Sequence, residues 1–150
     1  MTDYVENHSG NFTISTDPAK LDTDAIAEML SRAYWARGRT RDRLERALHH
    51  SLVFGLYEGS RQIGLARVVS DFSIFAYLCD VIIHEDYRGR GLGKWLVQTA
   101  MAHPDLHGLR RWVLATMDAH ELYRRFGWQD LGHPEWMMEI LKPNPGEDDA

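Results

Sequence analysis

The sequence predicts an α+β fold, with a mixed but mostly antiparallel sheet of about six to seven strands flanked by about four helices. Short β-rich runs follow one another across tight turns in the first half of the chain, which favours antiparallel pairing. Between residues 75 and 116 a strand, a helix and another strand succeed each other, and this order implies a parallel crossover. A chain of 150 residues is the ordinary size of one domain.

Apolar spacing and turn residues give the elements of the first half. In chain order we expect a strand at 12–16, a helix from 22 or 23 to about 38, a shorter helix at 40–50, and strands at 51–58 and 62–70. Asp22 or Thr23 is placed to cap the first helix, and Thr40 to cap the second.

The second half continues the same α+β pattern. In chain order we expect a buried central strand at 75–83, a helix that opens at 92, a strand at 112–116, a helix at 118–126 and a final strand pair at 128–131 and 136–141. Asp118 and Glu121 form a capping-box arrangement for the last helix. We expect one domain over 1–142 and a flexible tail at 143–150, where proline, glycine and acidic residues gather.

Composition excludes several function classes. The formal net charge of −5 argues against nonspecific nucleic-acid binding, which needs a basic face. We expect no membrane partner, because no apolar stretch approaches the length that spans a bilayer and the N-terminus does not resemble a secretory signal. Cys79 is the one cysteine, which excludes an internal disulfide and a cysteine-built zinc site; we expect no metal and a reducing, cytoplasmic location.

A glycine-rich loop links the central strand to the helix that follows it. In Arg88-Gly89-Arg90-Gly91-Leu92-Gly93 three alternating glycines allow a tight bend that exposes backbone N–H groups at the start of a helix. Oriented amides and the helix dipole favour an anion, and Arg88, Arg90 and Lys94 add positive charge. A diphosphate is the ligand that this arrangement predicts.

Two common phosphate loops do not fit these residues. The dinucleotide fingerprint requires glycine where Lys94 stands, and it belongs to an early strand. The P-loop requires glycine at Arg88 and serine or threonine at Trp95. Magnesium and a nucleoside triphosphate are therefore not expected.

The loop resembles the signature of the GNAT N-acetyltransferase superfamily, in which Arg or Gln is followed by glycines at this spacing. Residues 81–87 look like the central strand of that family and its lead-in. Residues 119–128, Ala-His-Glu-Leu-Tyr-Arg-Arg-Phe-Gly-Trp, resemble its second landmark, a helix that bears Leu-Tyr and ends in Gly plus an aromatic residue. The two landmarks occur in the order and at the separation of the family, and the order of elements matches from about Phe12 to Leu141.

The resemblance implies that acetyl-CoA is the acyl donor and a primary amine of a small molecule or peptide the acceptor, which attacks the thioester directly. It places the diphosphate on the loop and the pantetheine along the central strand, in a cleft where this strand parts from the strand that ends at Thr116. The implied cofactor-binding residues are Val81, Ile82, Ile83, Arg88, Gly89, Arg90, Gly91, Leu92, Gly93, Lys94 and Tyr123. A noncatalytic acetyl-CoA-binding regulatory module is the alternative function.

Tyr123 and Asp80 are the candidate catalytic residues. Tyr123 matches the family position that commonly protonates the leaving sulfur, although a tyrosine there can also simply pack on an apolar helix face. Asp80 interrupts an apolar strand, and is either a base for the amine or the partner of Arg67 in a salt bridge. Asp118 and His120 are rival bases. The family has no single universal base position.

The acceptor pocket is expected from the first two helices and their connection. Tyr34, Trp35 and Arg39 offer aromatic surface and a guanidinium group, and Thr116 lies across the cleft. The alternative is that the aromatic residues pack in the core and the arginines face solvent. A homodimer is also possible, through residues 136–138 on the last strand, although a place in the core explains these residues equally well.

Overall fold

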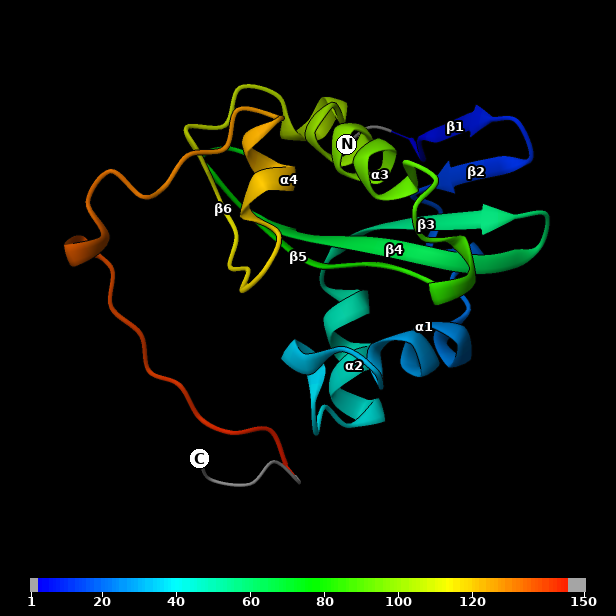
Figure 1. Ribbon diagram of the computed structural model, residues 1–150, viewed down its shortest axis with the longest axis horizontal. Helices are drawn as coiled ribbons and strands as arrows, with labels where there is room; N and C mark the ends of the chain where they lie inside the picture. The colour runs from blue at the N-terminus through cyan, green and yellow to red at the C-terminus, as the bar shows by residue number, and fades with distance from the viewer. Residues whose placement is uncertain (1–2, 146–150) are drawn as a thin grey trace.

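The computed structural model describes residues 3–145 and is built on one six-stranded sheet (Figure 1). The strands lie in the sheet in chain order: β1 (Glu6–Ser9), β2 (Phe12–Ser15), β3 (Leu52–Glu58), β4 (Arg61–Ser70), β5 (Phe75–Ile83) and β6 (Arg111–Val113). Every neighbouring pair is antiparallel except β5 and β6, which are parallel. The predicted α+β class is confirmed.

Four α-helices flank the sheet, and short 3-10 helices join the elements. The α-helices are α1 (Thr23–Leu30), α2 (Arg41–His49), α3 (Leu92–Met101) and α4 (His120–Arg124). The 3-10 helices are η1 (Pro18–Lys20), η2 (Tyr34–Ala36), η3 (Glu85–Tyr87), η4 (Pro104–Leu106) and η5 (Pro134–Trp136). Figure 1 shows α3 and α4 over one face of the sheet and α1 and α2 over the other.

Each face of the sheet has its own apolar core. Phe54 and Leu96 lie in the cluster beneath α3, and Leu65 and Ile26 lie in the cluster beneath α1 and α2. This division follows from the alternation of side chains along a strand, which sends Leu65 and the adjacent Ala66 to opposite faces. Because β5 contributes side chains to both clusters, it is packed on both of its faces.

The predicted caps of the first two helices are confirmed. The Oδ1 atom of Asp22 accepts the N–H of Ala25 at 3.1 Å, and Oγ1 of Thr40 accepts the N–H of Arg43 at 3.3 Å. The first helix ends at Leu30, however, and not near residue 38. Extended backbone at Ala33 redirects the chain into η2 (φ −93°, ψ 129°).

The parallel pair β5 and β6 is short. Only Phe75 to Tyr77 pair with β6, opposite Arg111 to Val113, so the strand predicted at 112–116 ends earlier. Beyond Tyr77 the two strands separate. A second irregularity follows in β5, because Leu65 pairs with Ile82 whereas Arg67 pairs with Cys79. The extra residue in this stretch of β5 is a β-bulge, which interrupts the hydrogen-bond ladder.

Two predictions about the C-terminal quarter are wrong. Asp118 does not cap α4; the N-cap is Ala119, and Oγ1 of Thr116 accepts the N–H groups of Asp118 and Ala119 at 3.4 and 3.0 Å. Threonine thus closes the turn that aspartate was expected to close. The final strand pair is also absent from the described part of the chain.

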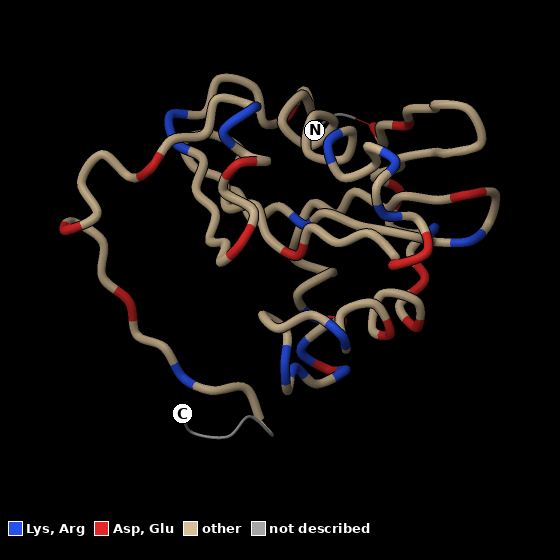
Figure 2. The backbone as a smooth tube through the Cα atoms, viewed as in Figure 1, with Lys and Arg blue, Asp and Glu red and all other residues tan. Residues whose placement is uncertain are grey.

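The chain after Trp128 leaves the body of the molecule. Residues 129–145 contain only η5, and Figure 1 shows this segment (orange to red) arching away from β6 and α4 and ending below α2. The predicted tail at 143–150 lies mostly outside the described residues. Figure 2 shows basic and acidic residues interspersed over the rest of the chain. Within residues 3–145 no helix has the length and apolarity needed to cross a bilayer.

Candidate active site

The glycine loop begins α3 without a capping side chain. Gly89 and Gly91 have left-handed backbone, with φ of 78° and 77°, and Gly91 is the N-cap residue of α3. This conformation favours glycine, since any other residue would be strained there. Among the described residues no capping side chain accepts a hydrogen bond from this helix end, so its first N–H groups remain available to a ligand.

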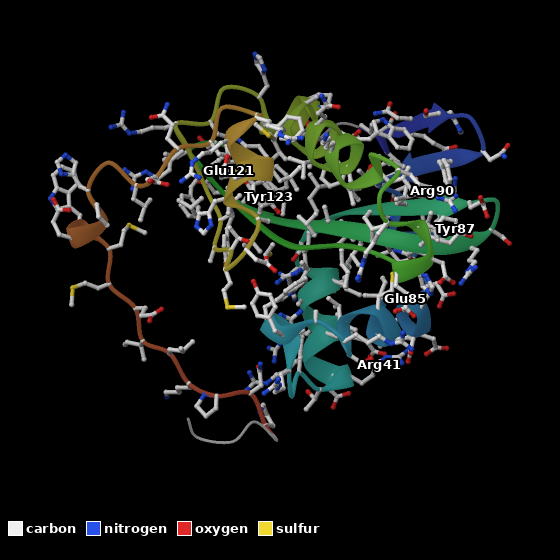
Figure 3. The ribbon with its side chains drawn as sticks, in the orientation of Figure 1. Arg41, Glu85, Tyr87, Arg90, Glu121 and Tyr123 are labelled. Carbon is white, nitrogen blue, oxygen red and sulfur yellow. The ribbon has the colours of Figure 1, made fainter. Side chains whose placement is uncertain are left out.

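Positive side chains are held around this loop by specific contacts. The Arg90 guanidinium lies 5.1 Å from the centre of the Tyr87 ring, and Figure 3 shows the two residues side by side at the end of β5. The Tyr87 hydroxyl donates to Oε1 of Glu58 at 2.8 Å, and Nε of Arg88 donates to the carbonyl oxygen of Ile83 at 3.0 Å. A cation on an aromatic face is restrained without losing its charge.

A cleft of about 970 Å³ runs from this loop to α4. It opens where β5 and β6 separate, as predicted. Its lining includes Tyr34, Trp35, Asp80, Val81, Ile82, Ile83, Arg88, Gly93, Leu114, Thr116, Asp118 and Tyr123. The structure therefore brings the predicted strand residues, two residues of the loop, the tyrosine of α4 and both predicted aromatic residues to one cavity.

Asp80 is the centre of a buried ion cluster. Its Oδ2 atom accepts hydrogen bonds from Nη1 of Arg39 and Nε of Arg67, each at 2.8 Å, and its Oδ1 accepts from Nε1 of Trp35 at 2.9 Å. The carboxylate side chain is 1% exposed. Burial by itself would raise the pKa of Asp80, but the two guanidinium groups outweigh burial and lower it.

The backbone of Asp80 explains why an aspartate can lie at the bulge. Its φ is 53°, in the left-handed region that aspartate and asparagine tolerate better than other side chains. The cluster binds η2 to β4 and β5 at this point, because Trp35 and Arg39 come from the connection between α1 and α2. Of the two roles weighed for Asp80, the salt bridge with Arg67 is present.

Tyr123 lies buried in the cleft wall. Its ring packs edge-on to Trp128, with centroids 5.9 Å apart. Burial, together with the nearby Tyr34 and Asp118, raises the pKa of Tyr123 to about 12. Its hydroxyl therefore stays protonated at neutral pH, so it can donate a hydrogen bond into the cleft. The hydroxyl of Tyr34 accepts the N–H of Met117 at 3.1 Å, which links η2 to the segment between β6 and α4.

A model of the acetyltransferase (GNAT) family matches residues 23–128, which contain the loop, the cleft and Tyr123. The chain belongs to the GNAT family. A Gibberella zeae protein described as an acetyltransferase is 35% identical to it, over 87% of this chain and 86% of that protein. This GNAT protein is accordingly an acyltransferase.

Two further relatives differ in how much of the chain they share. The crystal structure of a GNAT-family protein from Xanthomonas campestris pv. campestris superposes with a TM-score of 0.86 at 44% identity, over 91% of this chain and 96% of that one. Serotonin N-acetyltransferase 2, chloroplastic, of Oryza sativa subsp. japonica is 31% identical over 65% of this chain and half of its own length. The Xanthomonas structure shares the fold of this chain over nearly its whole length.

One predicted acceptor residue of this GNAT protein lies outside the cleft lining. The guanidinium of Arg39 forms an ion pair with Asp80 and does not line the cleft. Arg32, which was not among the predicted site residues, does line it. Arg32, just after the end of α1, also forms an ion pair with Glu85 of η3. No local signal could identify it, because its position depends on α1 ending at Leu30.

The other candidates of this GNAT protein are separated by the structure. Asp118 lines the main cleft, and His120 lines a smaller groove beside β6. Cys79 also lines the cleft and is half-buried, and burial raises the pKa of its thiol to about 11. A thiol of this kind is poorly suited to be a nucleophile at neutral pH.

Proposed function

We propose that the protein is an acetyl-CoA-dependent N-acetyltransferase that acetylates a primary amine by direct attack on the thioester. The observation that carries this proposal is the single cleft that joins the amide-rich start of α3 to the buried hydroxyl of Tyr123. A diphosphate at one end and a leaving sulfur at the other require a site of this extended form. Membership of the family indicates acyl transfer as the reaction, and the shape of the cleft favours acetyl-CoA as the acyl donor.

The loop fits the diphosphate of the donor. A Cβ atom built at Gly89 or Gly91 would meet no protein atom within 4 Å, so the space in front of both residues is open. The helix dipole and each nearby cation contribute about 0.3–1 kcal/mol to anion binding at an exposed helix end. Arg88, Arg90 and Lys94 are the cations that we assign to this role. When bound, acetyl-CoA supplies the thioester carbon that the amine attacks.

The floor of the cleft is suited to developing negative charge. The bulge opposite Ala66 frees backbone hydrogen-bonding groups of β5 at Asp80 and Val81. Fixed backbone donors stabilise an oxyanion because they need no reorientation when the charge appears. We assign the Asp80 cluster to holding this bulge in place.

The reaction depends above all on a base that removes a proton from the acceptor amine. A lysine-like amine with a pKa near 10.4 loses about 4–5 kcal/mol before reaction, since so little of it is neutral at pH 7. Asp80 is unsuited, because both of its oxygens accept hydrogen bonds from cationic or indole donors and its pKa is lowered. We propose that Asp118, in the cleft lining beside Tyr123, receives the proton through water.

Tyr123 is assigned to the leaving sulfur. With a pKa of about 12 its hydroxyl keeps its proton at rest, whereas the departing thiol has a pKa of about 8.5. The hydroxyl therefore stabilises the thiolate mainly as a hydrogen-bond donor. The exposed rings of Tyr34 and Trp35 provide the acceptor side of the cleft with apolar surface, which favours an amine with an apolar body.

Two measurements test the proposal. Calorimetric titration with acetyl-CoA should show binding at one site per chain, and Gly91→Ala should weaken it. A panel of aliphatic, aromatic and peptide amines should then be screened for release of free thiol. Binding with thiol release on at least one amine supports the enzyme; binding without turnover on the panel would favour the regulatory alternative, and no binding at millimolar concentration would refute both.

A further inference from the structure

Aromatic rings line the cleft on the face of the sheet that carries α1 and α2. Tyr34 and Trp35 belong to η2, and Tyr77 belongs to β5. Ala76 and Leu78, the neighbours of Tyr77, pack in the cluster beneath α3, so the ring of Tyr77 points to the opposite face. Figure 1 shows α1, α2 and their connection on that opposite face. We call the part of the cleft formed by Tyr34, Trp35 and Tyr77 the aromatic side.

The rings of η2 are held in place and still face the cavity. Tyr34 and Trp35 pack edge to face, with centroids 5.1 Å apart and ring planes at 88°. The hydroxyl of Tyr34 accepts the N–H of Met117, and the indole N–H of Trp35 donates to a carboxylate oxygen. Tyr34, Trp35 and Tyr77 are nevertheless 42%, 38% and 38% exposed. A ligand that covers rings already held in position loses little free energy to ordering them.

The charged groups of the cleft favour an acceptor with a single ammonium group. The described lining of the cleft contains the carboxylates of Asp80 and Asp118. Both oxygens of Asp80 are engaged, and the two guanidinium groups bound to it leave that cluster with a net positive charge. Within the described lining, Asp118 is therefore the carboxylate left to face an ammonium group. A second ammonium group would enter the cleft without a counter-charge, which is costly.

The size of the cavity and the nature of its wall favour a flat aromatic body on the acceptor. The volume of about 970 Å³ lies at the upper end of the range of about 300–1,000 Å³ for small-molecule sites, so it leaves room for an acceptor beside the arm of the donor. Aromatic rings attract another ring more strongly than an aliphatic group of similar area, because the positive edge of one ring meets the negative face of the other.

We propose that the acceptor is an arylalkylamine, with one ammonium group and an aromatic ring on a short aliphatic linker, and that Tyr77 determines this specificity. The proposal rests on the acetyltransferase function proposed above. The ring of the acceptor lies on the aromatic side, and its nitrogen faces Asp118 and the thioester. The nitrogen forms the amide bond as the C–S bond breaks. Of the two protons that the ammonium group loses, one passes to solvent and one ends on the thiol.

Tyr77 is the ring best suited to a test. Tyr34 and Trp35 connect elements of the fold through their polar groups, whereas the Tyr77 hydroxyl has no hydrogen-bond partner within residues 3–145. Its replacement therefore breaks no hydrogen bond of the described structure. Phe75 provides a matched control, because it lies two residues earlier on the same face of β5 and is 39% exposed but does not line the cleft.

The first experiment compares three amines on the wild-type protein by release of free thiol from acetyl-CoA. Phenethylamine should have a kcat/KM about 3- to 10-fold above that of cyclohexylethylamine, which has the same linker and a similar apolar area but no aromatic ring. Hexamethylenediamine, which carries a second ammonium group, should fall about 100-fold below phenethylamine. Equal kcat/KM for phenethylamine and cyclohexylethylamine, or faster turnover of the diamine, would overturn the proposal.

The second experiment repeats the comparison on three variants. Tyr77→Leu should abolish the preference for phenethylamine over cyclohexylethylamine, and Tyr77→Phe, which keeps the ring, should retain it. Phe75→Leu should leave the preference unchanged, because that ring lies outside the cleft lining. Equal losses of the preference in Tyr77→Leu and Phe75→Leu, or an unchanged preference in Tyr77→Leu, would remove Tyr77 from substrate recognition.

Calorimetry with acetyl-CoA separates this proposal from the function on which it rests. The affinity should be the same in the wild type and the three variants, because Tyr77 and Phe75 lie at the start of β5 and the glycine loop follows its end. A protein that acetylates cyclohexylethylamine as fast as phenethylamine has the proposed function and refutes the arylalkylamine specificity alone. A protein that binds acetyl-CoA and acetylates no amine, or that does not bind it, refutes both.

Discussion

Asp80→Asn should destabilise the protein strongly, because it leaves two guanidinium groups without a counter-charge in a buried site. Asparagine has nearly the shape of aspartate and tolerates a φ of 53° equally well, so the backbone need not move. The side chains of Arg39 and Arg67 are only 19% and 14% exposed, and both donate to the same oxygen of Asp80. Breaking a buried ion pair on one side costs about 3–5 kcal/mol.

The assay is the thermal midpoint, with a control that makes the same chemical change on the surface. At roughly 2–4 °C per kcal/mol for a chain of this size, the loss corresponds to a fall in Tm of about 6–20 °C. Asp24→Asn removes one of the two carboxylate partners of Arg41, at an ion pair whose carboxylate is 87% exposed, and this should cost about 1 kcal/mol or less. The difference in Tm between the two variants measures the effect of burying the ion pair.

The pH dependence provides an independent check on Asp80. Its pKa in the folded protein lies below the unfolded value of about 3.9, so its contribution to stability is present above that pH and is lost as pH falls through the folded pKa. The stability gap between wild type and Asp80→Asn should stay constant from pH 8 to about 5 and shrink below about 4. An unchanged Tm combined with loss of turnover and of the acid limb of the rate profile would show instead that Asp80 is the base.

Three further predictions follow from the cleft. Tyr123→Phe should lower turnover about 100-fold with little change in acetyl-CoA affinity, since a thiol leaves readily and needs only the low end of general-acid assistance; equal rates at all pH values would remove Tyr123 from the mechanism. Gly91→Ala and Gly59→Ala, both at left-handed glycines, should each cost about 1–2 kcal/mol of stability by urea titration, but only the Gly91 variant should weaken acetyl-CoA binding. Alkylation of Cys79 by iodoacetamide should rise about tenfold per pH unit up to pH 11, and a plateau near pH 8 would contradict its raised pKa.

The parts of the site that were predictable carry local signals. The glycine loop was evident because alternating glycines between a strand and a helix have few other uses, and the caps at Asp22 and Thr40 act within three residues of themselves. Val81 to Ile83 and Tyr123 were expected from the resemblance to the GNAT family, and the structure brings them to one cavity.

The parts that could not be predicted depend on distant partners. The bonds from Arg39 and Trp35 to Asp80 cross 41 and 45 residues, and they form only because α1 ends at Leu30 and η2 turns back toward β5. Asp118 was expected to cap α4 from its residue type, yet the N-cap residue is Ala119, and Oγ1 of Thr116 accepts the N–H groups of Asp118 and Ala119 in the turn before the helix.

The sequence by itself determined the α+β order of elements as far as α4, the glycine-rich loop before α3 and the family, since each depends on spacing and residue type over a few neighbouring positions. Only the tertiary structure decided where β5 and β6 separate, what neutralises Asp80, and that residues 136–141 lie outside the sheet. Apolar alternation shows that a segment can form a strand. Which edge it joins is decided by the surfaces that remain open once the rest of the chain has packed.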